Sequence, residues 1–555
     1  MVKRQLEAFL REALAKASQK ENWPISGEEV SGLLVERPRE PQWGDYSSPL
    51  PLQLASRLKK PPRSIAQTLV AHFPETNLLE QISIEGPGYV NFILSSSWLV
   101  EQVDEILRQG ERYGDIDLGG GKKVQVEFVS ANPTGPLTVG SGRNAVIGDV
   151  LANVLEAAGY KVQREYYIND AGTQMRLFAE TLFARYAQAL GVDEPIPEHG
   201  YRGSYMVELG REIASEEGDK FLHMPREQAI EAIGEIGLKK MLARIKADLE
   251  YIGVRYDNWF SERSLYRDGL FEKVMEILKE KGFIAEKDGA IWFVSSELGE
   301  DKDNVIVRRT GEPTYFASDI AYHYDKFFRR GFDWVIDVWG ADHQGHVPRM
   351  KAMMKAFGLD PERLSVVLYQ MVTLKRGGKE IRISKRTGEI ITLRELAEEV
   401  GPDAVRFFLL ARAPSSHMDF DLDLAVQQSS ENPVYYVQYA HARICSIFRN
   451  AGDLDYSQGD VRLLTHPREL ALIRQLVRLP EIIELVVNQL APHHLAFYSQ
   501  ELASAFHLFY RDCRVLSSNP EDREITMARL KLVKATQIIL GKILRLMGVK
   551  APERM

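Results

Sequence analysis

The chain has 555 residues, which is enough for about three domains that each bury a core of their own. It is 45% hydrophobic and 27% charged, as ordinary globular proteins are, and its formal net charge of −8 excludes a protein coated in positive charge but not local basic surfaces. Because Cys445 and Cys513 are the only cysteines and no apolar run reaches membrane-spanning length, we expect a reducing, cytoplasmic compartment without a disulfide framework.

The first part of the chain, residues 1–115, is predicted to form a small α+β domain. It opens with MVKRQLEAFLREALAKA, which reads as an amphipathic helix rather than a signal peptide. A second helix is expected around LPLQLASRLKK, and two strand-like segments flank the GPG at Gly86–Gly88. The stretch GGGKK at Gly119–Lys123 is predicted to link this domain to the next one. The apolar stripe of the first helix consists of Leu6, Phe9, Leu10, Ala13 and Leu14.

From Val124 the pattern changes to alternating strands and helices, which predicts a parallel sheet. A strand over 124–128 is followed by apolar residues at helical spacing from Ile147 to Ala158 and by a second strand, KVQREYYI. Another strand, WVIDVWG, ends near residue 340, and a helix is expected from about 347. We expect mostly charged helices inserted over 180–310 and an almost wholly helical chain from about 400 to Met555.

The stretch VEFVSANPTGPLTVGSGRNAVIGD, Val126–Asp149, reads as the end of a strand, a tight polar loop and the start of a helix. Such a loop can cradle a phosphate chain. Its spacing is not G-x-G-x-x-G, so a nicotinamide site is disfavoured. Taken alone, the loop is equally compatible with an ordinary turn between a strand and a helix.

The whole stretch resembles the HIGH segment of class I aminoacyl-tRNA synthetases. It is most similar to the arginyl family, which usually reads S-A/P-N-P-x-x-P-L-H-V-G-H-x-R, and only the two histidines differ, here Thr138 and Ser141. Further matches in the family's order cover almost the whole chain. They are WGDYSS, GPGYVNF, YYINDAGTQM, YFASDIAYHYDKF, VWGADHQGH, ISKRTGEIITL, DAVRFFLL, NPVYYVQYAHARI and APERM.

The resemblance implies a two-step reaction. The carboxylate of arginine attacks the α-phosphate of ATP, and the arginyl group then passes to the 3′-terminal adenosine of tRNA(Arg). Donors and cations placed around the phosphates are the expected source of rate. The implied partners are arginine, ATP with its own Mg²⁺, and tRNA, with no protein-held metal and no membrane, and we expect a monomer.

Two loops are implied as the phosphate site. In the first, hydroxyls of Thr138 and Ser141 would replace the imidazole donors, and Gly140 would permit close approach of the nucleotide. Alternatively, the two hydroxyls only form hydrogen bonds with the backbone of their own loop. The second, KRGGKEIRISKRTGEI, resembles the KMSKS loop, and Lys385 would be the cation on the pyrophosphate side. The implied ATP-binding residues are Pro136, Thr138, Gly140, Ser141, Arg143, Ser384 and Lys385, of which Thr138, Gly140, Ser141 and Lys385 are expected to be catalytic.

An arginine pocket needs acceptors, because a guanidinium carries five donors and no acceptor. The resemblance implies that Asp319 pairs with the guanidinium and that Tyr315, four residues earlier, lines the pocket. Asn132 would meet the α-amino group, and Glu127 the amino or the guanidinium end. Each of these residues also has an ordinary structural explanation. The full expected set is Glu127, Ser130, Asn132, Tyr315, Asp319, Asp342 and His343.

The segment ADHQGH also permits a zinc hypothesis, in which Asp342, His343 and His346 are ligands. A further protein ligand at sensible spacing is missing, so we favour magnesium carried by ATP.

Aromatic side chains stack on splayed RNA bases. By resemblance, Tyr436, Ala440, Tyr510 and Met555 would surround the anticodon, and Tyr89 and Asn91 would touch the tRNA elbow. Tyrosines that merely pack a helical bundle are the structural alternative.

We therefore predict a multidomain α/β protein. Residues 1–115 form an α+β tRNA-elbow domain, 116–400 a class I Rossmann-like catalytic domain with helical insertions, and 401–555 an all-α anticodon-binding domain. The rivals are a non-catalytic tRNA-binding paralogue, suggested by the missing histidines, and a class I ligase for a different amino acid. Retention of Lys385 and of the acidic pocket argues against both.

Overall fold

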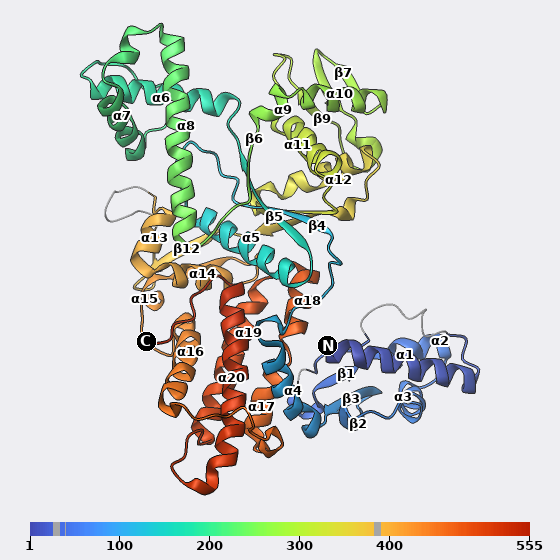
Figure 1. Ribbon diagram of the computed structural model, residues 1–555. Coiled ribbons are helices and arrows are strands. Elements are labelled where there is room, and N and C mark those ends of the chain that lie inside the picture. Colours follow the sequence, from blue (N-terminus) through green and yellow to red (C-terminus); the bar gives the residue numbers. More distant parts are fainter. Residues whose placement is uncertain (26–33, 39, 382–389) are drawn as a thin grey trace.

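The computed structural model describes residues 1–25, 34–38, 40–381 and 390–555. Three parts follow one another along the chain: an N-terminal α+β part, a central part with two lobes, and a bundle of helices that ends at the C-terminus (Figure 1). No helix of the described residues is long and apolar enough to cross a membrane.

The N-terminal part is an antiparallel sheet of order β1-β3-β2 covered by helices. The first helix buries Leu6, Leu10, Ala13 and Leu14, as its spacing predicts, because these residues share one helical face. The two strands predicted on either side of the GPG are β2 and β3. The elements are α1 (Val2–Glu21), β1 (Tyr46–Ser48), α2 (Leu50–Leu58), α3 (Pro62–Ala71), β2 (Leu79–Glu85) and β3 (Tyr89–Leu94).

Helix α4 (Ser96–Gln109) leaves this part and packs against α17 (Pro467–Leu476) and α20 (Arg523–Leu546) of the helical bundle (Figure 1). Its buried residues include Val103 and Ile106. Polar contacts reinforce the packing: Lys531 Nζ lies 2.8 Å from Asp104 Oδ1. The N-terminal sheet itself touches the bundle through Asp45, whose carboxylate accepts from Arg474 Nε at 2.9 Å.

The central sheet has five parallel strands in the order β11-β10-β4-β5-β6. The order reverses beside β4, which pairs with β5 on one side and with the much later β10 on the other. In such sheets ligands bind beyond the carboxyl ends of the strands at the reversal point. The strands are β4 (Lys123–Glu127), β5 (Lys161–Ile168), β6 (Asn258–Ser261), β10 (Trp334–Gly340) and β11 (Leu364–Tyr369), and α5 (Val139–Ala157) connects β4 to β5.

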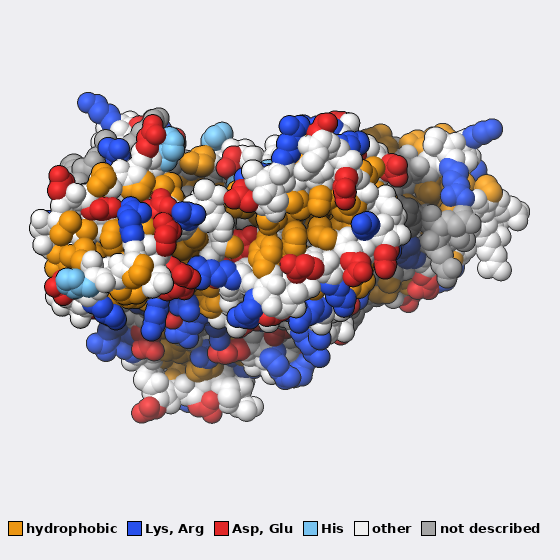
Figure 2. Space-filling view, turned by 90° about the horizontal axis from the view of Figure 1, so that it is seen from above, with side chains coloured by type: hydrophobic (Ala, Val, Ile, Leu, Met, Phe, Trp, Pro, Cys, Tyr) orange, Lys and Arg blue, Asp and Glu red, His pale blue; other side chains and the backbone are white. Residues whose placement is uncertain are grey.

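Two lobes are inserted into this sheet. They lie side by side when the molecule is seen from above, and Lys and Arg are interspersed with Asp and Glu over both (Figure 2). The first lobe holds α6 (Thr173–Ala189), α7 (Ser204–Glu217) and α8 (Arg226–Tyr251). The second holds α9 (Arg263–Arg267), α10 (Leu270–Glu280), β7 (Ile284–Lys287), β8 (Ala290–Phe293), β9 (Asn304–Val307), α11 (Tyr315–Tyr324) and α12 (Val347–Ala356).

The prediction of mostly helices over 180–310 is wrong for Ile284–Val307, which forms a three-stranded sheet. Asp288 and Gly289 both have positive φ, 54° and 76°, in the two-residue turn between β7 and β8. An Asp-Gly pair suits such a turn because both central residues must adopt the left-handed conformation. The charged residues around it obscure this hairpin signal in the sequence.

The C-terminal part is helical, as predicted, with one exception: β14 (Met418–Asp421) pairs in parallel with β12 (Val372–Arg376), which also pairs with β13 (Lys379–Ile381). The helices are α13 (Leu393–Val400), α14 (Pro402–Leu410), α15 (Leu422–Ala425), α16 (Pro433–Ala451), α17, α18 (Leu479–Gln489), α19 (His493–Asp512) and α20. The expected division at about residue 400 therefore falls between α13 and α14.

Candidate active site

The loop after β4 begins with a strained turn. Val129 and Ser130 have φ of 66° and 41°, a conformation that is rare for a β-branched residue and typical of functional sites when it occurs. The buried side chain of Asn144 holds the turn, because its Oδ1 accepts from Val129 N at 2.8 Å. Ser130 Oγ consequently donates to Glu127 Oε1 at 3.0 Å and accepts from Tyr167 N at 3.1 Å.

The segment Thr138–Ser141 forms the amino end of α5. Thr138 is the N-cap, and its Oγ1 accepts from Ser141 N at 3.3 Å, while the two hydroxyl oxygens are 3.3 Å apart. A Cβ added to Gly140 would meet only the Thr138 hydroxyl, at 3.6 Å, so the side of Gly140 is open. Partial positive charge at a helix amino end favours anions. Pro136 is exposed in the same loop.

The second phosphate loop lies outside the described residues, and with it Ser384 and Lys385. Its immediate continuation is described and contacts the first loop. Leu393 N donates to Leu137 O at 2.8 Å, and Thr138 forms a backbone bridge with Thr392. The start of α13 thus borders the amino end of α5.

The expected ATP contact of Arg143 is wrong. Its side chain is fully buried, and its guanidinium donates to three backbone carbonyls, those of Gln370 at 2.6 Å, Ser416 at 2.9 Å and Ala413 at 2.9 Å. Burial is the main reason that its pKa is lowered to about 10. Arg143 lies one turn inside α5, on its buried face. Its guanidinium therefore holds the backbone around Gln370, Ala413 and Ser416 against α5 and does not bind a ligand.

Acidic side chains gather beside the carboxyl end of the central strands. Asp319 of α11 is partly buried, and its carboxyl has no ion-pair partner in the part of the chain that the structure describes. Burial, followed by the charges of Glu127, Glu262 and Asp337, raises its pKa to about 8, although Lys326 opposes the shift. An acid in this environment is poised to receive a cation.

Glu262 is an acid of this pocket that the sequence analysis missed. It is 5% exposed, and its Oε2 has no hydrogen-bond partner among the described residues. Burial is the main cause of its raised pKa, while Ser318 and Tyr167 beside it act in the opposite direction. A buried oxygen without a partner is costly unless a ligand supplies a donor. Position 262 lies outside every motif quoted above, so only the fold identifies it.

A cavity of about 460 Å³ opens next to these acids. Glu262 and Ser318 line it from one side, and Tyr315, which is 52% exposed, lines it near the mouth. Tyr315 and Asp319 both belong to α11 and are one helical turn apart, as predicted. The cavity has the size of a small-molecule site with a few polar groups on its wall.

The other residues expected to bind arginine, Asn132, Asp342 and His343, are more exposed to solvent. Asn132 is exposed, and its amide bridges Gln174 Oε1 at 2.7 Å and Asn169 Nδ2 at 3.2 Å, both from the YYINDAGTQM segment. Asp342 and His343 lie in the turn directly after β10. Both are exposed, and His343 Nε2 is 3.5 Å from Asp342 Oδ2. Asp342, His343 and His346 do not form a metal-holding group in the described part of the chain.

The expected RNA contacts divide into accessible and inaccessible residues. Asn91 is 2% exposed and its Oδ1 accepts from Ser47 Oγ at 2.7 Å, while Ala440 is fully buried. The side chains of Asn91 and Ala440 are therefore not accessible to RNA. Asn91 lies on β3, the middle strand of its sheet, and Ala440 lies on the buried face of α16. Tyr510 and Met555 are exposed, and Tyr89 is half-buried.

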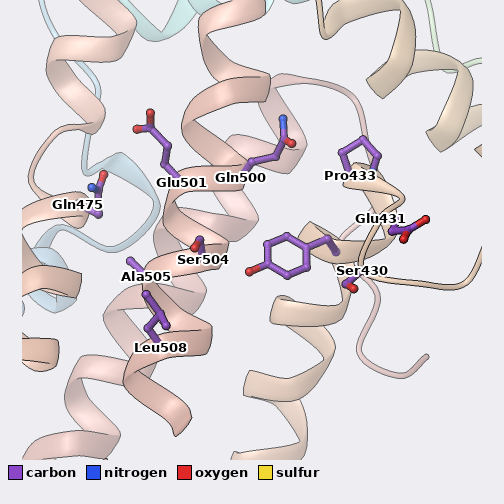
Figure 3. Close-up of a pocket in the computed structure, with 10 residues that line it drawn as sticks. Ser430, Glu431, Pro433, Gln475, Gln500, Glu501, Ser504, Ala505 and Leu508 are labelled. Atoms are coloured by element: carbon purple, nitrogen blue, oxygen red, sulfur yellow. The ribbon is translucent and has the colours of Figure 1, made fainter. Parts of the chain in front are cut away.

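Tyr436 contributes to a cavity of about 590 Å³ between α16 and α19. Ser430, Glu431 and Pro433 lie on one side of it, and Gln500, Ser504 and Leu508 of α19 lie on the other (Figure 3). The Tyr436 ring packs against His507 in a tilted arrangement with 4.7 Å between ring centroids, and this contact supports the tyrosine at the cavity wall.

A parallel sheet of this order, a strand-to-helix loop with a free helix amino end at its reversal point, an inserted lobe and a helical C-terminal part together define a class I aminoacyl-tRNA synthetase. Family comparisons agree. The chain matches the arginyl tRNA synthetase N terminal domain over 4–94, the class I (R) tRNA synthetase catalytic domain over 102–411 and the DALR anticodon binding domain over 437–555.

Whole-chain relatives specify the amino acid. An arginine–tRNA ligase of Dehalococcoides mccartyi is 55% identical over 548 residues, 98% of each chain, and one of Carboxydothermus hydrogenoformans is 49% identical over 99% of this chain and 98% of the relative. Among solved structures, Thermus thermophilus arginyl-tRNA synthetase has a TM-score of 0.78 at 25% identity over the full length of both chains. The Campylobacter jejuni protein described as an arginyl-tRNA synthetase has a TM-score of 0.76 at 33% identity, covering 83% of this chain and 100% of its own.

The chain belongs to the arginyl-tRNA synthetase family. It is an enzyme that charges tRNA with arginine, and the adenylate intermediate is standard for the family. The predicted family, fold class and activity are confirmed, and both rival functions are excluded.

Proposed function

We propose that the cavity lined by Glu262, Ser318 and Tyr315 holds the side chain of arginine. The observation that carries this proposal is the buried Glu262 oxygen at the wall of this cavity of about 460 Å³, which has no hydrogen-bond partner among the described residues. Asp319 directly follows the lining residue Ser318 in α11, and its carboxyl has no ion-pair partner in the described part of the chain. A guanidinium offers five donors in a plane, so it can satisfy both carboxyls at once. Tyr315 closes the side of the cavity near its mouth.

The α-amino and carboxyl end of arginine extends from this cavity toward the first loop. Glu127 and Ser130 are coupled by a 3.0 Å hydrogen bond, and both lie at the end of β4, between the acids and α5. Asn132 is exposed further along the same loop and receives the amino end. Asp342 and His343 border this end from the turn after β10.

ATP enters as its Mg²⁺ complex and lies across the amino end of α5. Thr138 uses an acceptor lone pair for its cap, which leaves the hydroxyl proton free to donate to a phosphate oxygen. Ser141 Oγ is 3.3 Å from it and supplies a second hydroxyl, while Gly140 and Pro136 leave room for the nucleotide. Ser384 and Lys385 complete the phosphate site from the second loop.

In this arrangement the arginine carboxylate attacks the α-phosphorus, pyrophosphate leaves, and the tRNA 3′-adenosine takes the arginyl group. Pre-placed donors stabilise the charge that grows on the phosphate oxygens. The tRNA contacts are Tyr89 at the elbow side and Tyr436, Tyr510 and Met555 at the anticodon side, where the cavity between α16 and α19 has room for an unstacked base.

The working unit in this proposal is a cytoplasmic monomer. Its parts are 1–115 for the tRNA elbow, 116–400 for catalysis and 401–555 for the anticodon. The boundary at residue 115 separates α4 from the helices it touches, because α4 packs on α17 and α20 of the C-terminal bundle although it precedes residue 115.

Arginine-dependent ATP–pyrophosphate exchange, run with and without tRNA(Arg), tests the pocket. Asp319→Asn should raise the arginine KM by about 10²-fold or more, because a buried charge loses its partner, and leave the ATP KM unchanged. Asp268→Asn is the matched control, since Asp268 is exposed on the same lobe. An arginine KM within about twofold of the parent in the Asp319→Asn enzyme would refute the pocket.

A further inference from the structure

Three buried carboxylates form a row across the central sheet. Asp337 of β10 is in register with Glu127 of β4, which in turn is in register with Glu165 of β5. Side chains at matching register on neighbouring parallel strands point to the same face of the sheet. Asp337 and Glu165 are fully buried and Glu127 is 9% exposed, so three negative charges would repel one another in a poorly screened environment.

Three basic side chains lie over this acidic row: His323 of α11, Lys326 of the π-helical turn Asp325–Arg329, and Arg330 directly after that turn. Lys326 Nζ donates to Glu127 Oε2 at 2.6 Å and to Asp337 Oδ1 at 3.0 Å. The other two basic side chains contact the ends of the row. His323 Nε2 is 2.9 Å from Asp337 Oδ2, and Arg330 forms a forked pair with the two oxygens of Glu165 at 2.5 and 2.9 Å.

His323 links this row to the backbone of α11. Its Nδ1 is 2.8 Å from the backbone carbonyl of Asp319, which can only accept, so Nδ1 donates. Its Nε2 faces Asp337, whose pKa is lowered by Lys326 and His323 in spite of its burial. The carbonyl of Asp319 is thus tied to the row.

Lys326 occupies the centre of this arrangement. It is fully buried, and burial alone would lower its pKa, but Asp337, Glu127 and Glu165 outweigh that effect and raise it. Glu127 is held from both sides, with Oε2 on Lys326 and Oε1 on Ser130. Asp319 and Glu262 lie outside this row and have no ion-pair partner in the described part of the chain.

We propose that Lys326 is a positioning residue for arginine: its ammonium fixes the Glu127 carboxylate in the orientation that the substrate meets. The inference rests on the proposed role of Glu127 as an arginine contact. Lys326 acts through Glu127 and does not itself contact the substrate. Loss of its charge frees Glu127 to rotate, and arginine then binds to a misplaced partner.

A single Lys326→Met substitution would leave the buried Glu127 without its cation and Asp337 with His323 alone, and would strongly destabilise the fold. The double variant Lys326→Met/Asp337→Asn avoids this, because it removes one cation and one anion and keeps the row balanced. The matched control is Arg330→Met/Glu165→Gln, which removes a pair at the other end of the row without contact to Glu127. Lys326→Arg is the conservative variant that keeps the cation.

The measurements are the KM values for arginine and ATP and kcat in tRNA-dependent pyrophosphate exchange, with the melting temperature of each variant. We expect Lys326→Met/Asp337→Asn to raise the arginine KM by about 30-fold or more at an unchanged ATP KM. The control pair should stay within about threefold of the parent, and Lys326→Arg should recover most of the loss. A merely structural row would lower the melting temperature of both double variants alike and change arginine KM equally, which would overturn the proposal.

Glu127→Gln separates this proposal from the one it rests on. If Glu127→Gln raises the arginine KM and the Lys326→Met/Asp337→Asn enzyme does not, the arginine contact is correct and the positioning role is refuted. If Glu127→Gln leaves the arginine KM unchanged, Glu127 is not an arginine contact, and both proposals fail at that residue.

Discussion

Arginine binding should depend steeply on pH because the empty pocket holds Asp319 in its protonated form. The pKa of this carboxyl is raised from 3.8 to about 8, first by burial and then by the neighbouring acids. A guanidinium pairs with the ionised carboxylate, so below pH 8 arginine must displace a proton. Each pH unit below 8 therefore costs about tenfold in affinity, or about 1.4 kcal/mol, and above pH 8 the dependence levels off. Between pH 6 and pH 8 the dissociation constant should fall by about 50-fold, because the carboxyl is still half protonated at pH 8.

Isothermal titration of the full-length enzyme with arginine from pH 6 to pH 9 measures this dependence. Titrations in two buffers of different ionisation enthalpy count the protons released, and we expect close to one per arginine at pH 7. Asp319→Asn should abolish both the slope and the proton release, whereas Asp268→Asn should retain them. A dissociation constant that is flat between pH 6 and pH 8, with no proton release, would refute the reasoning.

The same shift has a consequence for the ligand-free fold. A carboxyl whose pKa is raised on folding contributes stability that is fully present below its ordinary pKa near 3.8 and is lost as pH rises through about 8. Arginine offsets this loss. The increase in melting temperature that saturating arginine causes should therefore be larger at pH 8 than at pH 6.

Two substitutions in the first loop and α5 test the division between the phosphate site and the structural residues. Thr138→Val should slow arginyl-adenylate formation by about 10²-fold, the effect of losing one donor to the transition state, whereas Thr138→Ser should remain close to the parent. Unchanged single-turnover rates in Thr138→Val would mean that the hydroxyl serves only as the helix cap. Arg143→Met should lower the free energy of unfolding by about 3 kcal/mol or more, because three backbone carbonyls lose the donor that the buried guanidinium supplies, and leave the ATP KM within about twofold in the folded enzyme. A selective rise in the ATP KM at unchanged stability would contradict the structural role of Arg143.

Hydrophobic periodicity was sufficient to predict the principal elements that carry the site. The alternation over 124–128 became β4, and the helical spacing after it became α5. The hairpin at Asp288–Gly289 had a turn signal, but four-residue strands with charged side chains carry too little alternation to be distinguished from helix.

The errors at the site have a common cause, which is that a motif gives residue order but not the direction of each side chain. Arg143 stands in a motif that lines the phosphate site, yet it lies on the buried face of α5. Glu262 carries no local signature. It reaches the pocket because β6 ends at the same edge of the parallel sheet as β4, and this juxtaposition depends on strand order. Lys326 stands in the segment YFASDIAYHYDKF, but its contacts with Glu127 and Asp337 depend on the fold and on the register of β4 and β10.

The packing of α4 on the helical bundle decides where the chain can be divided. A fragment that begins at residue 116 would lack α4 and uncover the apolar faces of α17 and α20 that Val103 and Ile106 cover. A fragment that begins at Ser95 keeps this helix together with its N-cap, whose side chain accepts from Trp98 N. The 14 residues of α4 therefore belong to the C-terminal bundle in space, although they are far from it in sequence.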